Sequence, residues 1–263
     1  MSETRQTVRN TLALLAFLLA ALILWQAVTA LRLLPSYAFP SPAQVVERLW
    51  ELAVDGQLWP SVRASVIRMA LGFVLSAALG LLIGLAMGTS ELVSSSLRSV
   101  FLGLQTLPSA AWVPISLLIF GLSDASIYFV IIMSSTAAMA IATADGIAHI
   151  PPVFMRAART LGTPPRAMST RVVLPAALPS IVTGIKLGWT LGWHGVVSAE
   201  LIKSSVGLGF LLHAGRELND AAQVIGIMLV TIFLGLLLDR LLFATVERSV
   251  RARWGFAPVA AGA

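Results

Sequence analysis

Six long, predominantly apolar runs constrain this chain more than any other feature, because each is long enough to cross a lipid bilayer. A transmembrane helix needs about 20 such residues. The chain is 57% hydrophobic and only 11% charged, less charge than a soluble domain carries. We therefore predict an all-α membrane protein made of a single domain over 1–263. Its six spans are expected at about 11–31, 66–88, 99–122, 125–145, 178–199 and 221–243.

Two prolines interrupt the third of these runs. Pro108 and Pro114 both lie inside 99–122. A proline removes a backbone N–H donor and clashes with the preceding helical turn. Such a break is tolerated at membrane depth only where other protein segments cover the backbone or where it lines a cavity. We therefore expect this helix to be kinked or broken at a position that faces protein.

The basic residues predict how the chain is oriented. It has 18 Lys and Arg against 12 Asp and Glu, and the arginines flank the apolar runs. With the N-terminus inside, eleven of these cations fall in cytoplasmic segments and five in outer segments. This bias is the positive-inside pattern, so both termini are expected in the cytoplasm. Because the cations follow the spans, membrane lipid rather than nucleic acid is the expected partner of this basic chain.

Motifs that would supply chemistry or energy are missing. No G-x-x-x-x-G-K-[ST] loop for ATP occurs, the three histidines lack metal-site spacing, and the chain has no cysteine. Asp145 and Asp239 fall at the ends of predicted spans, which leaves no carboxylate inside a span for proton transport. We predict no catalytic residue, no metal site and no cofactor in this chain. It has the features of a transporter without its own source of energy.

The stretch 151–162 predicts a short helix between the fourth and fifth spans. Phe154, Ala157, Ala158 and Leu161 fall at i, i+3, i+4 and i+7, which gives a single apolar stripe. Gly162 suits a left-handed helix stop, and two prolines follow it. The residues alone leave two interpretations open. The helix is a docking surface for another protein, or it is a loop whose arginines anchor the membrane side.

A resemblance favours the first interpretation. RAARTLGTPPRAMSTRVVLPAALPSIVTGIKLG resembles the EAA motif of permease subunits of ATP-binding-cassette (ABC) importers. LQTLPSAAWVPISLLIFGLSDAS is similar to a segment of the nitrate, sulfonate and taurine group of these permeases. LGWHGVVSAELIKSSVGLGFLL and GLLLDRLLFATVERSVRARW resemble the same group, and the likeness covers about 36–254.

This resemblance implies the fold of a type I importer permease and a coupling helix that docks on an ATPase subunit. It assigns that role to Arg156, Ala157, Ala158, Arg159, Leu161 and Gly162. Arg156 stands where the motif has glutamate, so the docking charge differs. The implied partners are a second permease copy, two cytoplasmic ATPase subunits that bind ATP and Mg, and an extracytoplasmic binding protein. The implied location is the bacterial cytoplasmic (inner) membrane.

The resemblance also implies a small anionic solute, such as nitrate, bicarbonate, taurine or a sulfonate. An ATPase-independent secondary carrier or channel is the alternative function. Alternative roles exist for individual side chains too: tryptophans also anchor or pack helices, and His194 can bond a neighbouring backbone group. Lys186 is close enough to the cytoplasmic surface to extend toward it, which from the sequence alone argues against a role as an anion ligand. The candidate pathway residues are Gln105, Ser109, Trp112, Trp189, Trp193 and His194.

Overall fold

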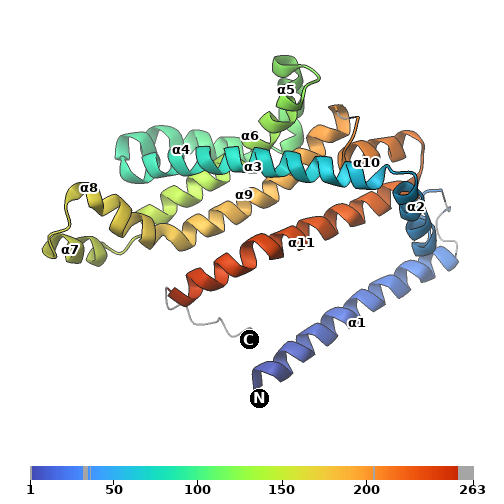
Figure 1. Cartoon of the computed structure of the whole chain (residues 1–263), viewed down its shortest axis with the longest axis horizontal. Coiled ribbons are helices and arrows are strands. Elements are labelled where there is room, and N and C mark those ends of the chain that lie inside the picture. The colour runs from blue at the N-terminus through green and yellow to red at the C-terminus, as the bar shows by residue number, and fades with distance from the viewer. Residues whose placement is uncertain (1, 32–34, 36, 204, 254–263) are drawn as a thin grey trace.

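The computed structural model describes residues 2–31, 35, 37–203 and 205–253, and all regular structure in these residues is helical. The all-α prediction is therefore confirmed. The helices form an elongated bundle (Figure 1). They are α1 Ser2–Ala30, α2 Pro42–Val54, α3 Leu58–Thr89, α4 Glu91–Thr106, the 3-10 turn η1 Ser109–Ala111, α5 Trp112–Phe120, α6 Asp124–Ala148, α7 Pro152–Thr160, α8 Pro165–Met168, the π-helix η2 Ser169–Val173, α9 Leu174–Lys203, α10 Leu208–Glu217 and α11 Ala221–Arg253.

Within the described residues, five helical segments are long and apolar enough to cross a membrane, and they account for five of the six predicted runs. The sixth run corresponds to α4 and α5, which pass the same test together but are bent by 98°. The five are Leu12–Ala30, Leu58–Thr89, Asp124–Ala148, Ser169–Ile202 and Ala221–Val246.

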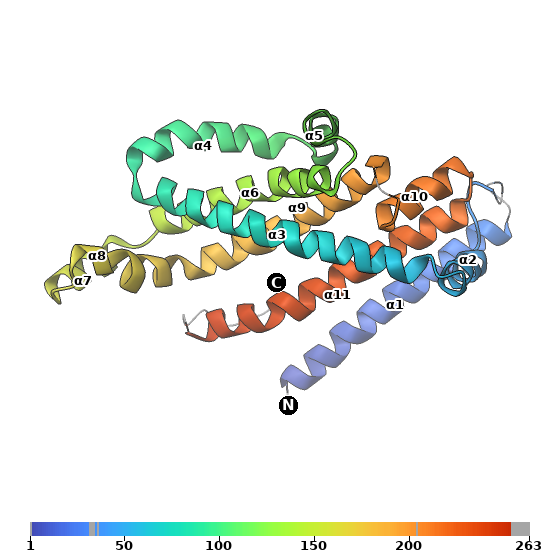
Figure 2. The ribbon, with the colours of Figure 1, turned by 45° about the horizontal axis from the view of Figure 1, so that its top comes forward.

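The bend between α4 and α5 lies at the first of the two prolines. Pro108 follows the C-terminus of α4 and caps η1, which leads into α5. Pro114 falls in the first turn of α5, where a missing N–H leaves no intrahelical hydrogen bond unmade. Figure 2 shows α5 turned away from the direction of α4. The expected break is therefore present, and it divides the predicted helix into two.

The central helix of the bundle is α6, which packs between α3 and α9. Its contact with α3 is close because small residues recur every fourth position along α3. A Cβ on Gly84 would lie 2.5 Å from Thr143 Cβ and 2.6 Å from the carbonyl oxygen of Ala140. In membranes, where lipid is as apolar as leucine, such backbone-to-backbone packing drives helix association. The close contact between α3 and α6 thus depends on the glycines of α3, which have no side chain to hold the two backbones apart.

Adding one methyl group at this contact should destabilise the bundle. We expect Gly84→Ala to lower the thermal midpoint by about 5 °C, because overpacking a core costs about 1–3 kcal/mol. Gly235→Ala is the matched control, since no atom lies within 4 Å of its Cβ position. Thermal unfolding in detergent, followed by fluorescence-detected gel filtration, measures both. Equal midpoints for the two variants would contradict close packing of α3 on α6.

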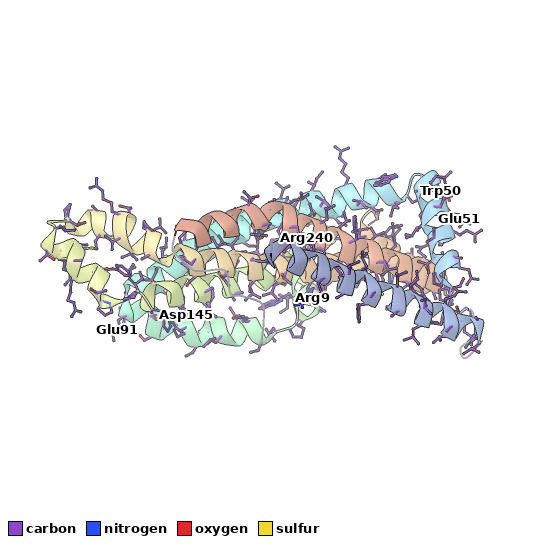
Figure 3. All side chains as sticks on the ribbon, turned by 90° about the horizontal axis from the view of Figure 1, so that it is seen from below. Arg9, Trp50, Glu51, Glu91, Asp145 and Arg240 are labelled. Atoms are coloured by element: carbon purple, nitrogen blue, oxygen red, sulfur yellow. The ribbon has the colours of Figure 1, made fainter. Side chains whose placement is uncertain are left out.

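The two ends of the bundle differ in structure. One end, here called the α2 end, carries α2 and α10, and the other, the α7 end, carries α7 and α8 (Figures 1 and 2). The N-terminal end of α1 and the C-terminal end of α11 both point toward the α7 end (Figure 1). Figure 3 shows Trp50 and Glu51 at the α2 end, and Glu91 and Asp145 toward the other.

A buried carboxylate ties three segments together toward the α2 end. Glu200 of α9 accepts hydrogen bonds from Ser65 Oγ (2.7 Å), Arg68 Nη1 (2.9 Å) and the Gly209 backbone N–H (3.1 Å). Ser65 Oγ in turn accepts from the Leu208 N–H at 2.8 Å. The Glu200 side chain is 0% exposed. This group of residues, here the Glu200 cluster, joins α3, α9 and α10.

Candidate functional site

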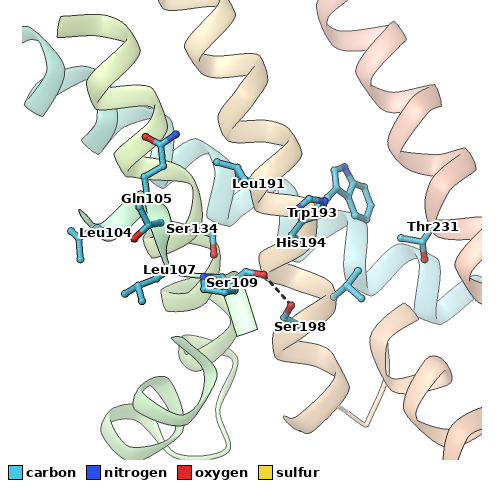
Figure 4. A pocket seen from close by; sticks show the side chains of 13 residues that line it. Leu104, Gln105, Leu107, Ser109, Ser134, Leu191, Trp193, His194, Ser198 and Thr231 are labelled. Atoms are coloured by element: carbon cyan, nitrogen blue, oxygen red, sulfur yellow. Dashed lines mark hydrogen bonds between the residues drawn. The ribbon is translucent and has the colours of Figure 1, made fainter. Parts of the chain in front are cut away.

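A cavity of about 580 Å³ opens where the third predicted span is broken. Its walls come from α4, η1, α6, α9 and α11 (Figure 4). Segments far apart in the sequence therefore meet around one space. The polar side chains that line it are Gln105, Thr106, Ser109, Ser134, Ser198 and Thr231, with His194 beside them.

The break at Pro108 places the first wall of this cavity. The α4 helix ends at Thr106, and the N–H of Ala111 bonds the Pro108 carbonyl at 2.9 Å to begin η1. The turn brings Ser109 to α9, where its hydroxyl lies 3.1 Å from the Ser198 hydroxyl (Figure 4). The prolines thus create a polar wall in an apolar region.

The described residues that line the cavity include hydroxyl, amide and imidazole side chains but no Asp, Glu, Lys or Arg. Hydroxyl and amide groups both donate and accept hydrogen bonds. Such a surface can replace part of the hydration shell of a small polar solute. Because it holds no fixed charge, it does not trap an ion of either sign.

Four of the six candidate pathway residues line the cavity. They are Gln105, Ser109, Trp193 and His194, with His194 exposed and Trp193 buried. Trp112 and Trp189 do not line it and lie in the apolar core, to which Trp193 also belongs. Trp189 lies edge-on to Phe73 with ring centroids 4.9 Å apart, which is the packing arrangement that the sequence left open as an alternative.

Four hydroxyl groups of the cavity were not among the sequence candidates: Thr106, Ser134, Ser198 and Thr231. A partial signal exists for Ser198, because it follows His194 by four residues and so shares a face of the helix. Ser134 and Thr231 give no such signal. They lie in apolar helices whose rotation only the packed bundle fixes.

The α7 segment, residues 152–168, forms the second candidate region. Val153, Phe154 and Leu161 are exposed, Leu161 by 85%, while Ala158 is only 8% exposed and packs with Met168 and Val173. The expected single stripe is therefore divided, because α7 touches its own chain along one edge of that stripe. Phe154, Ala157 and Leu161 face outward, and Arg156 and Arg159 are exposed beside them.

Gly162 ends this helix as its position predicts. The observed helix is Pro152–Thr160, shorter at both ends than the expected 151–162. Gly162 adopts φ +75°, in the left-handed region. The Gly162 N–H bonds the Arg159 carbonyl and the Thr163 N–H bonds the Ala158 carbonyl, each at 3.0 Å. These two bonds form a Schellman motif, which holds Leu161 outward at the tip.

A π-helix joins this segment to the helix that lines the cavity. In η2 the Leu174 N–H donates to the Ser169 carbonyl, five residues earlier, and α9 follows without a break. His194 lies twenty residues after Leu174, about 30 Å along the helix. The continuous η2–α9 helix thus runs from the α7 segment at its start to the cavity near its other end. Single π turns in α-helices occur frequently at functional sites.

The chain matches a known protein family over most of its length. Residues 76–252 match the family described as the binding-protein-dependent transport system inner membrane component. This range contains the broken span, the cavity and the α7 segment.

Several curated proteins are similar over most of their length. The nitrate import permease protein NrtB of Leptolyngbya laminosa is 33% identical over 219 residues, covering 80% of this chain and 78% of its own. The taurine transport system permease protein TauC of Escherichia coli is 32% identical, covering 82% and 81%. A putative aliphatic sulfonates transport permease protein, SsuC of Bacillus subtilis, is 33% identical, covering 84% and 81%.

Among solved structures, the MetNI methionine ABC transporter in inward-facing conformations contains a chain of similar fold. The TM-score is 0.57 at 17% sequence identity, and the match covers 70% of this chain and 94% of that one. At this identity the likeness concerns the fold alone. It agrees with the expectation of an importer permease fold.

Proposed function

This chain belongs to the family of binding-protein-dependent transport system inner membrane components, and from that premise we propose that it forms the pathway for a small anionic solute. The solute is delivered by an extracytoplasmic binding protein. Two copies of the chain form the pathway together, and two separate ATPase subunits bind ATP and Mg and drive it.

The observation that carries this proposal is the continuity of η2 and α9. One end of this element joins the α7 segment, with Phe154 and Leu161 exposed, and the other lines the cavity at His194 and Ser198. A partner that moves the α7 segment would therefore move one wall of the cavity. Exposed leucine and phenylalanine next to arginines suit a protein partner at this tip.

The solute class follows from the relatives and from the cavity lining. The similar permeases are named for nitrate, taurine and aliphatic sulfonates, which share planar or tetrahedral oxyanion groups. Hydroxyls such as Ser109 and Ser198, with the amide of Gln105, can donate to such oxygens. A neutral lining favours passage over tight binding, as a pathway requires.

We propose that both termini and the α7 segment lie in the cytoplasm. The excess of arginine in those segments supports this orientation. The bundle supports it too, because the start of α1, the end of α11 and the α7 segment share one direction (Figure 1). The α2 end then faces the binding protein.

Copurification and obstruction of the cavity test the proposal together. We expect the tagged chain, purified from its native membranes, to bring an ATPase subunit with it.

Ser198→Trp should fill the cavity and lower solute uptake at least tenfold without loss of that subunit. Leu118→Trp is the control, since Leu118 is 86% exposed on the outside of α5. Ser198→Ala controls for the lost bond to Ser109. Undiminished uptake in Ser198→Trp, or uptake without any ATPase, would contradict the proposal.

A further inference from the structure

One face of α9 is open along the membrane-spanning part of the helix. Thr183, Lys186, Thr190 and His194 recur at intervals of three and four residues, so they lie on the same face. Thr183, Thr190 and His194 are exposed and Lys186 is half-buried, whereas the opposite face is packed against α6 and α3. Polar groups inside a span face a protein interior or water rather than lipid. His194 lines the cavity, so this face leads from the cavity toward the α7 end.

An ion pair lies on this continuation. Lys186 Nζ is 3.4 Å from Asp239 Oδ2 of α11, and the two side chains are 36% and 28% exposed. Lys186 is eight residues from His194, about 12 Å further along α9. Asp239, which the sequence placed at a span end, lies inside the apolar window that runs to Val246. The pair is thus within the span and accessible from its open side.

The geometry of this pair is loose. Tight charge-assisted contacts are about 2.7–2.9 Å long, and Arg98–Asp145, at 2.6 Å, is one of them in this protein. The Lys186–Asp239 contact is longer, at 3.4 Å, and part of both groups is exposed as well. A half-exposed pair of this kind contributes little to stability. It is well suited to exchange partners.

We infer that Lys186 is an anion-binding residue of the inner half of the pathway, and that Asp239 is the counter-ion which the travelling anion displaces. The inference rests on the proposed function. An ammonium without a counter-ion would hold an oxyanion and delay its release, whereas a path without the ammonium would offer only neutral donors. The ammonium of Lys186 attracts the anion, and competition from Asp239 shortens the time for which the anion stays bound.

Neutralising the pair separates this role from a structural one. We expect Lys186→Gln/Asp239→Asn to assemble in normal amounts and to take up ¹⁵N-nitrate or taurine at less than a tenth of the wild-type rate. If the pair only held α9 against α11, the neutral pair would hold it equally well. Uptake at more than half the wild-type rate in the double variant would overturn the inference.

A second readout does not depend on transport. The full chain in lipid nanodiscs is titrated with sodium chloride, and chloride-35 line broadening reports bound anion. Asp239→Asn should broaden the line at least threefold more than the double variant, and added nitrate should reverse the broadening. Equal line widths in the two variants would overturn the inference. If the wild type takes up none of the anions, the proposed function fails, and the line widths alone decide the role of Lys186.

The matched control is Arg98→Gln/Asp145→Asn. It makes the same chemical change in a pair of similar exposure, 37% and 39%, between α4 and α6. This double variant should keep at least half of the wild-type uptake and show no added line broadening. A tenfold loss of uptake here as well would mean that neutralising any ion pair of the bundle stops transport, which would overturn the specific role of Lys186.

Discussion

Glu200→Gln is expected to remove most of the folded protein from the membrane, although the side chain keeps its size. In the Glu200 cluster, Oε1 accepts from Arg68 while Oε2 accepts from Ser65 and Gly209. A glutamine must place its NH₂ group against one of these two sets of donors. Whichever way it turns, a buried donor faces another donor, and Arg68 loses its buried charged partner.

The cost of this change is large because the Glu200 side chain is fully buried. Breaking a buried pair by removing one charge typically costs about 3–5 kcal/mol. We expect a fall of about 10 °C in the thermal midpoint and loss of the joint between α3, α9 and α10. Fluorescence-detected gel filtration of solubilised membranes measures both the yield and the midpoint.

Asp124→Asn provides the matched control. Asp124 also pairs with Arg68, at 3.2 Å, and undergoes the same carboxylate-to-amide change, but its side chain is 56% exposed. Exposed pairs are worth about 0–1 kcal/mol, so this variant should accumulate almost normally. Normal yield and midpoint in Glu200→Gln would show that the buried carboxylate is not needed to hold the three helices.

Leu161→Asp should uncouple the permease while leaving it folded. Leu161 is 85% exposed at the tip of the α7 segment, so a charge there disturbs no contact within the chain. In the proposed complex it would be buried against an ATPase subunit, where an unpaired charge costs several kcal/mol. We expect copurification of the ATPase to fall at least tenfold, and solute-stimulated ATP hydrolysis to fall with it.

Two other variants show which surface is responsible. Leu218→Asp makes the same change at a leucine that is 70% exposed at the end of α10, toward the α2 end, and should leave ATPase binding unchanged. Ala158→Glu should instead lower the yield of the chain itself, because Ala158 packs on Met168 and Val173. Full ATPase binding by Leu161→Asp would mean that this tip is not the docking surface.

Features that depend on neighbouring residues could be predicted from the sequence. The length of the apolar runs predicts the long helices, Pro108 predicts the break before α5, and Gly162 predicts the left-handed stop. Each of these outcomes is decided by local backbone geometry. The prediction of a single outward-facing stripe on α7 is only partly correct, because Ala158 packs against Met168 and Val173 while Phe154 and Leu161 are exposed. Periodicity alone does not say that Ala158 faces inward.

Features that depend on distant residues could not be predicted. Ser65 and Glu200 are 135 positions apart, and no local pattern pairs them. The spacing of Lys186, Thr190 and His194 predicts that they share one face of a helix. It does not predict that Asp239 lies opposite Lys186. These contacts arise from the rotation of each helix within the bundle, which is set by packing such as that of Gly84 on Thr143.

The π-helical turn η2 has a mechanical consequence for the face that α9 presents. A π turn closes its hydrogen bond one residue later than an α turn, as the bond from Leu174 to Ser169 does. If η2 relaxed to α geometry, every residue after it would advance by one position, a rotation of about 100°. Lys186, Thr190 and His194 would then swing together from the open path toward a neighbouring helix. A small change of winding at the base of α9 would thus rotate the whole helix. A movement of the α7 segment could in this way change which side chains, polar or apolar, face the pathway.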